Sequence, residues 1–289
     1  MKIMSEKNTC PTPTGALLII GGAEAKEDAS KNDGNAASIG MEVLSCFMKL
    51  LSSEQPVIEV ITSASSEDPD DSFNNYEQSF KELGAYVVNH IHHDNRDDVV
   101  LADIENRLKA AHGVFIAGGD QLKLTAVYGG TDVLLLLKER YIHDKLVIAG
   151  TSAGAMAMST PMIYQGVGRD EMIAGNVKIT TGLEFLRDVC IDTHFVNRGR
   201  FVRMSQVIAT NPTSIGVGIE EDTAMVVRNG KDAEVVGCGV IIVINGFKSH
   251  GTNIHTHGDD EMLTIRGLNV DILSKGERFT IPEINPPHK

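Results

Sequence analysis

The apolar residues in the first half of the chain gather in short runs that are typical of buried strands. Most of these runs are continuously apolar over four or five residues, as expected for strands that are covered on both faces. They occupy residues 16–20, 57–61, 85–88, 113–117 and 146–149.

Between these runs the spacing of apolar residues changes to that of helices. Residues 39–51 carry apolar side chains every three or four positions, and residues 98–111 and 132–141 also have a helical pattern. The alternation predicts an α/β fold with a doubly wound, mostly parallel sheet flanked by helices. Ligands of such sheets lie beyond the carboxyl ends of the strands. We therefore expect the site at this rim, where three strands end in glycine: Gly21, Gly118 and Gly150.

The pattern changes again from about Thr223. Short apolar runs separated by turns that contain Gly, Asn or Asp predict an antiparallel C-terminal extension, with strands at 224–227, 234–236, 240–244 and 262–265. The chain shows no linker and no internal repeat, so we expect a flexible N-terminus over 1–14 and a single α/β domain over 15–289. Two polar segments, 23–34 and 65–71, are expected to be loops over the active rim or solvated surface.

The strand that ends at Ala149 leads into Gly150-Thr151-Ser152-Ala153-Gly154, and residues 155–158 are good helix formers. Strand, sharp turn and helix around a serine between small residues form the pattern of a nucleophile elbow. The new helix would direct its free N–H groups at a developing oxyanion. The alternative is an ordinary tight turn between a strand and a helix.

Composition restricts the function classes. The 289 residues are 42% hydrophobic and 22% charged, which is typical of a globular protein, and the net charge of −13 argues against nucleic acid or an anionic membrane as the main partner. The N-terminus does not resemble a signal peptide, no apolar stretch is long enough to span a bilayer, and a cytoplasmic location is expected. Four cysteines without metal spacing are interpreted as reduced, buried thiols: Cys10, Cys46, Cys190 and Cys238.

A serine nucleophile needs a base and a carboxylate that orients the base. Among ten histidines, His194 stands out because it follows the predicted strand 189–192 directly. Three arginines follow at close spacing: Arg198, Arg200 and Arg203. They predict a clamp for carboxylates, and a solvated basic helix face is the alternative. The carboxylate is sought where the apolar strand from Ile215 runs into three acids, of which one or two can face the site: Glu220, Glu221 and Asp222.

Two further histidine groups invite a metal interpretation. His90, His92 and His93 lack additional ligands at zinc spacing, so a strand-end cluster facing solvent is favoured. His255 and His257 would share one face of a strand, where a metal is conceivable but surface histidines are favoured.

Four separated motifs, in order, resemble those of the cyanophycinases. They are Gly118-Gly-Asp-Gln121, the elbow with Ala155, Asp192-Thr-His194-Phe with the arginines after it, and Gly218-Ile-Glu-Glu221-Asp-Thr-Ala224. Cyanophycinases are serine exopeptidases related to the aspartyl dipeptidases, on a flavodoxin-like sheet of the class I glutamine-amidotransferase type. The similarity extends from Gly21 to about Gly251.

The resemblance implies Ser152 as nucleophile, His194 as base and Glu221 as the orienting acid, with the N–H groups of Gly119 and Ala153 as oxyanion hole. The implied substrate is cyanophycin, a polyaspartate that bears arginine on each side-chain carboxylate and is released stepwise as β-Asp-Arg. No metal and no organic cofactor is implied, and a homodimer is suggested. Position 193 departs from the glutamine usual in the family. The implied substrate-binding residues are Gln121, Asp192, Thr193, Arg198, Arg200 and Arg203.

Three alternatives remain. An α/β-hydrolase esterase would place its histidine after the acid, and neither His255 nor His257 lies in a glycine-rich loop suited to this. A binding or regulatory protein without turnover is disfavoured because serine, histidine and acid are all present. The nearest rival is a peptidase for short Asp-containing or isoaspartyl peptides that uses the same triad.

Overall fold

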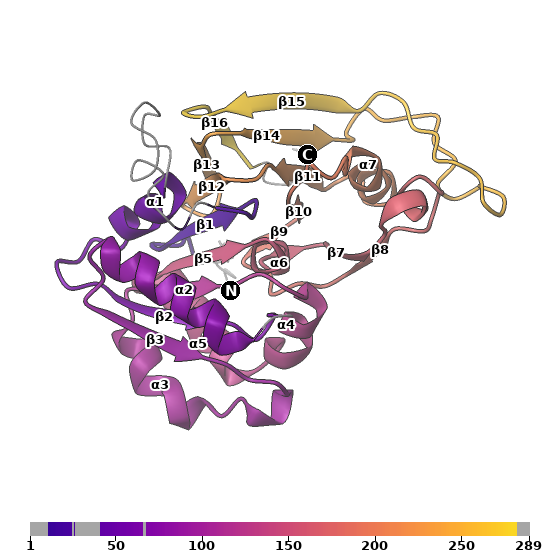
Figure 1. Ribbon diagram of the computed structural model, residues 1–289. Helices are drawn as coiled ribbons and strands as arrows, with labels where there is room; N and C mark the ends of the chain where they lie inside the picture. Colours follow the sequence, from indigo (N-terminus) through magenta and orange to yellow (C-terminus); the bar gives the residue numbers. More distant parts are fainter. Residues whose placement is uncertain (1–10, 25, 27–40, 66–67, 282–289) are drawn as a thin grey trace, which may run out of the picture.

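The computed structural model describes residues 11–24, 26, 41–65 and 68–281. Five consecutive parallel strands form one side of an eight-stranded sheet (Figure 1), and the expected doubly wound architecture is confirmed. In spatial order these strands are β1 (Ala16–Ile20), β5 (Val147–Thr151), β4 (Gly113–Ile116), β2 (Val57–Ile61) and β3 (Val87–Ile91).

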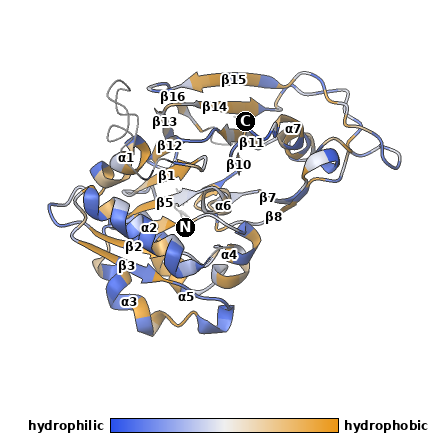
Figure 2. Cartoon of the chain, viewed as in Figure 1, coloured by the Kyte–Doolittle hydropathy of each residue, from blue (hydrophilic) through white to orange (hydrophobic). Residues whose placement is uncertain are grey.

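Helices cover both faces of this sheet because alternate strand residues point to opposite sides. On one face Leu18 and Phe115 pack with Phe47 and Phe80, which come from α1 (Glu42–Leu50) and α2 (Pro69–Glu82). The other face is covered by α3 (Leu101–Ala110), α4 (Gln121–Tyr128) and α5 (Asp132–His143). Figure 2 shows hydrophobic central strands and hydrophilic stretches along α2 and α3.

The antiparallel extension is present beside β1. It consists of β12 (Thr223–Arg228), β13 (Asp232–Gly237) and β16 (Arg278–Thr280). The strand expected at 262–265 is wrong, because only Met262 makes an isolated bridge, to Ile173.

A second, six-stranded sheet was not anticipated. The run expected at 240–244 in the extension pairs instead with β11, since its backbone groups lie in register with that strand. The order is β15 (Asn269–Ser274), β14 (Val240–Asn245), β11 (Ile215–Ile219), β10 (Val189–Asp192), β6 (Ser159–Thr160) and β9 (Leu186–Arg187). One hydrophobic cluster contains residues of both sheets, such as Ile148 and Val217.

Several predicted boundaries differ from those of the structure, most by one to three residues. Strand β3 begins at Val87 rather than at 85, and the helix expected over 98–111 is divided into a short 3-10 turn, η2 (Arg96–Asp98), and α3. Within the polar segment 65–71, Asp68 caps α2 by accepting N–H groups of Asp70 and Asp71, so part of that segment is helical. Residues 39–40, most of 23–34 and residues 1–10 of the N-terminal prediction lie outside the described residues.

The cysteine prediction is only partly right. Cys190 is buried on β10, and burial raises the pKa of its thiol, but Cys46 is half-buried and Cys238 is exposed. Cys238 lies in the turn between β13 and β14, outside both strands. Cys10 lies outside the described residues.

Candidate active site

Ser152 occupies a strained turn between β5 and α6 (Ala153–Ala157). Its backbone has φ 49° and ψ −115°, a conformation that L-residues rarely adopt. The flanking glycines are required by space: a Cβ atom at Gly150 would lie 2.6 Å from the carbonyl carbon of Gly154, and one at Gly154 would lie 2.3 Å from the oxygen of Ile116. The sequence pattern of an elbow thus corresponds to the local geometry of one.

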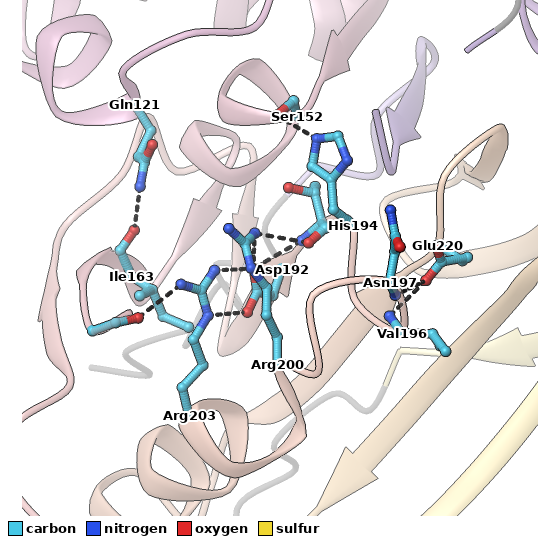
Figure 3. Close-up of polar contacts among 12 residues, drawn as sticks. Gln121, Ser152, Ile163, Asp192, His194, Val196, Asn197, Arg200, Arg203 and Glu220 are labelled. Atoms are coloured by element: carbon cyan, nitrogen blue, oxygen red, sulfur yellow. Dashed lines mark hydrogen bonds and ion pairs between the residues drawn. The ribbon is translucent and has the colours of Figure 1, made fainter. Parts of the chain in front are cut away.

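A chain of hydrogen bonds leads from Ser152 to a carboxylate. Ser152 Oγ lies 3.0 Å from His194 Nε2, and His194 Nδ1 lies 2.6 Å from Glu221 Oε1. Figure 3 shows the serine and the imidazole pointing toward each other. The backbone N–H of His194 donates to the oxygen of Gly21, 2.8 Å away, which ties the histidine to the end of β1.

The two adjacent glutamates point to different partners. Glu221 follows β11 and faces His194; the hydrogen bond from His194 lowers the pKa of its carboxyl group. Glu220 accepts the backbone N–H groups of Val196 and Asn197 (Figure 3), at 2.5 and 3.1 Å. Glu220 therefore holds the loop that carries His194, a role that sequence reasoning missed.

Two backbone N–H groups near Ser152 are free. Within the described residues, neither Gly119 nor Ala153 donates its N–H to a protein acceptor, and both residues line a cavity together with Ser152. Gly119 has φ 136°, and a Cβ atom there would lie 1.8 Å from the oxygen of Ala64, so only glycine fits. This arrangement suits a developing oxyanion.

The three arginines do not form a simple open clamp. Asp192 is fully buried and lies between Arg200 and Arg203 (Figure 3): Arg200 Nη1 lies 3.0 Å and Arg203 Nε 2.6 Å from its carboxylate. Arg203 also donates to the oxygen of Gly166, and Arg200 to that of Thr193. Arg198 is exposed and has no hydrogen-bond or ion-pair partner among the described side chains.

These side chains surround a cavity of about 120 Å³ beside Ser152, the arginine cavity. Its wall is cationic, since three guanidinium groups outnumber the one carboxylate behind them. Gln121 lines it and donates to the oxygen of Ile163 at 2.9 Å, while the buried Thr193 hydroxyl has no partner in the described ranges. Asp192 does not line the cavity, and its oxygens are already bound by the arginines. The site residues predicted from the sequence are therefore gathered in one place, with Asp192 behind the wall.

The other histidine groups lie elsewhere. His90, His92 and His93 form a cluster at the end of β3 that is only partly exposed, and the hydroxyls of Thr62 and Tyr128 lie 2.7–3.0 Å from their ring nitrogens. His255 and His257 lie in a turn rather than on a strand. In the part of the chain that the structure describes, no group of three or more His, Cys, Asp and Glu side chains is arranged to hold a metal ion.

A strained serine at an elbow, a hydrogen-bonded histidine and carboxylate, and two free N–H groups define the class of serine hydrolases that act by acyl transfer. The chain belongs to peptidase family S51, whose sequence model matches residues 30–235. It is thus a serine-type peptidase.

Its relatives and structural neighbours agree with this family. The chain is 33% identical to a cyanophycinase of Nostoc sp. over 96% of its own length and 94% of the relative's, and 33% identical to a cyanophycinase of Synechococcus elongatus over 95% and 82%. The fold matches the crystal structure of a peptidase from an acI-B1 actinobacterium, with a TM-score of 0.65, 19% identity, and 92% and 97% of the two chains covered. A putative peptidase E of Listeria monocytogenes matches with a TM-score of 0.52 and 19% identity over 78% and 99%.

Proposed function

We propose that this chain hydrolyses cyanophycin through an acyl-enzyme on Ser152. The observation that carries the proposal is the unbroken relay from Ser152 through His194 to Glu221, whose nucleophile Ser152 also lines a cationic cavity. The proposal is supported by full-length similarity to proteins named cyanophycinase.

The relay suits both halves of acyl transfer. His194 Nε2 takes the proton of Ser152 as Oγ attacks the scissile carbonyl, and Glu221 holds the Nδ1–H of the resulting imidazolium. The N–H groups of Gly119 and Ala153 receive the developing oxyanion. His194 then gives its proton to the leaving amine, and a water molecule activated by the same imidazole releases the acyl group.

The arginine cavity suits the acyl side of this substrate. Each aspartate of cyanophycin carries an arginine whose own carboxylate is free, and a guanidinium can bind such a carboxylate bidentately. Among the described residues the Arg198 side chain has no partner and Arg200 donates through Nη1 alone, so both side chains keep donors for the substrate. Arg203 and Asp192 hold Arg200 in place, while Thr193 and Gln121 complete the wall.

Purified protein incubated with cyanophycin is expected to release β-Asp-Arg, detected by mass spectrometry. Ser152→Ala should lower turnover by several orders of magnitude, because the nucleophile is lost while the fold is kept. A serine-directed covalent reagent should label the parent and spare the variant. Full activity of Ser152→Ala would contradict the mechanism.

The second candidate is an aspartyl or isoaspartyl dipeptidase. It is favoured by the small size of the arginine cavity, which at about 120 Å³ suits a bare aspartate side chain. Short α-Asp and isoaspartyl dipeptides are therefore tested beside cyanophycin. Hydrolysis of the dipeptides without release of β-Asp-Arg would replace the first proposal by this one.

We also propose that the enzyme works as a cytoplasmic homodimer. Among the described strands, β15 is an edge strand of the second sheet and exposes Ile272, and a second copy can pair with such an edge. Within the described ranges no helix is long and apolar enough to cross a membrane. Light scattering on the purified protein tests the dimer, and cell fractionation tests the location.

A further inference from the structure

A second hollow opens beside Ser152, separate from the arginine cavity. It measures about 650 Å³ and shares only Ser152 with the lining of that cavity. We call it the leaving-side hollow. Its walls come from the ends of β1, β4 and β5 and from α2, and its lining includes Glu24, Lys26, Tyr76, Gly118, Thr151 and His194.

Glu24 is the unusual residue of this hollow. Its side chain is 6% exposed, and its two oxygens accept hydrogen bonds from the hydroxyls of Tyr76, at 2.7 Å, and Thr151, at 2.6 Å. No cationic side chain in the described ranges forms an ion pair with it; the ammonium of Lys26 lies over the Tyr76 ring instead. A buried carboxylate held only by hydroxyls is costly unless a positive charge joins it.

The two hydroxyls leave room for such a charge. An ionised carboxylate has about four acceptor positions, and Tyr76 and Thr151 use two of them. They also fix the orientation of the carboxylate, so that little ordering remains when a cation binds. Burial, together with the neighbouring Glu24 carboxylate, raises the pKa of Tyr76, which stays a hydrogen-bond donor.

The position of His194 assigns the hollow to one side of the scissile bond. His194 lines the leaving-side hollow and does not line the arginine cavity, whereas Gly119 and Ala153 line only the arginine cavity. In acyl transfer the carbonyl oxygen points at the N–H groups, and the leaving amine must lie beside the imidazole that protonates it. The leaving part of the substrate therefore enters the hollow that contains Glu24.

We propose that the leaving-side hollow is a subsite for a cationic leaving group and that Glu24, held by Tyr76 and Thr151, receives its guanidinium. The inference rests on the proposed function, in which the residue after the scissile bond carries an arginine. Glu24 offers acceptor positions to a guanidinium of the substrate. Asp192 cannot do so, since its oxygens are already bound by Arg200 and Arg203. Glu24 is a specificity-determining residue, distinct from the triad.

The test compares two substrates that share the acyl residue and differ in the leaving part, which carries arginine or its neutral isostere citrulline. The parent enzyme is expected to prefer the arginine substrate in kcat/KM by roughly ten- to hundredfold, the worth of one charge-assisted hydrogen bond. Glu24→Gln should remove that preference and change hydrolysis of the citrulline substrate by less than about threefold. The matched control is Glu82→Gln, at an exposed position on α2, which should keep the preference.

A second measurement needs no variant. Butylguanidinium has no carboxylate for the arginine cavity, and it should protect Ser152 of the parent from a small neutral serine reagent, whereas neutral butylurea should not. Equal protection by both compounds, or an arginine preference that persists in Glu24→Gln, would overturn the proposal. Parallel loss of both substrates and of labelling in Glu24→Gln, with equal protection of the parent, would assign Glu24 a structural role only. Failure of the parent to hydrolyse either substrate would instead reject the proposed function.

Discussion

At the scale of single residues, the division of labour between Glu220 and Glu221 is the sharpest feature of the site. The two neighbours leave β11 in different directions: one carboxylate reaches the imidazole of His194 and the other caps the loop that carries it. Glu221 fixes the tautomer of His194, and Glu220 fixes the position of the loop that carries it.

Glu221→Gln is expected to lower kcat by about 10⁴, since an amide no longer fixes the tautomer of His194 or stabilises the imidazolium. Glu220→Gln should stay within about tenfold, because its amide oxygen can still accept the N–H groups of Val196 and Asn197. Steady-state kinetics on one substrate compares the two variants. The reverse ranking would show that the orienting acid is wrongly assigned.

At the scale of elements, the turn after β10 and the start of α7 (Phe201–Thr210) separate two kinds of arginine. Arg203 belongs to α7 and is buried against Asp192, whereas Arg198 lies on the exposed turn. The same residue type therefore holds the structure in one case and faces the cavity mouth in the other.

Arg203→Ala is expected to lower the free energy of unfolding by about 3 kcal/mol, because it breaks a buried ion pair. Arg198→Ala should leave stability unchanged and lower kcat/KM for carboxylate-bearing substrates by roughly ten- to hundredfold. Urea unfolding and kinetics, measured on both variants, separate the two effects. If Arg198→Ala unfolds as readily as Arg203→Ala, the turn is structural and the substrate assignment loses this support.

At the scale of the whole molecule, stability should depend on pH through the half-buried histidines at the carboxyl end of β3. Burial lowers the pKa values of His90 and His93. The unfolded chain therefore binds protons at a higher pH than the folded chain. The stabilisation is complete above the unfolded pKa of about 6.5 and is lost as the pH falls through the lower folded values.

His93→Gln should flatten the fall in unfolding free energy between about pH 7 and pH 5.5. The variant lacks one of the two histidines that take up a proton when the chain unfolds in this range. The glutamine amide can still bond the Tyr128 hydroxyl that His93 contacts. Urea unfolding at several pH values measures the slope, and His143→Gln, at an exposed position at the end of α5, serves as control. An unchanged slope in His93→Gln would contradict this origin of acid sensitivity.

The sequence by itself determined the parallel sheet, three of the helices that cover it (α1, α3 and α5) and the elbow at Ser152. These features depend on local periodicity and on glycines that a tight turn requires, so neighbouring residues are enough to predict them. Its place at a predicted strand end singled out His194, and motif resemblance chose Glu221 among three neighbouring acids; the structure places both within hydrogen-bonding distance along one relay.

Only the tertiary structure decided the rest. Periodicity says that residues 240–244 are a strand but not which strand they pair with, and register with β11 placed them in a second sheet. Hydrogen bonds from Tyr76 and Thr151 hold Glu24, and both partners lie far from Glu24 in the chain. Asp192 pairs with two arginines that follow it within the next 11 residues, but that pairing depends on how the turn after β10 folds back. A charged residue in a polar segment has no local signal that distinguishes solvated surface from a buried subsite, because its burial depends on what the fold brings against it.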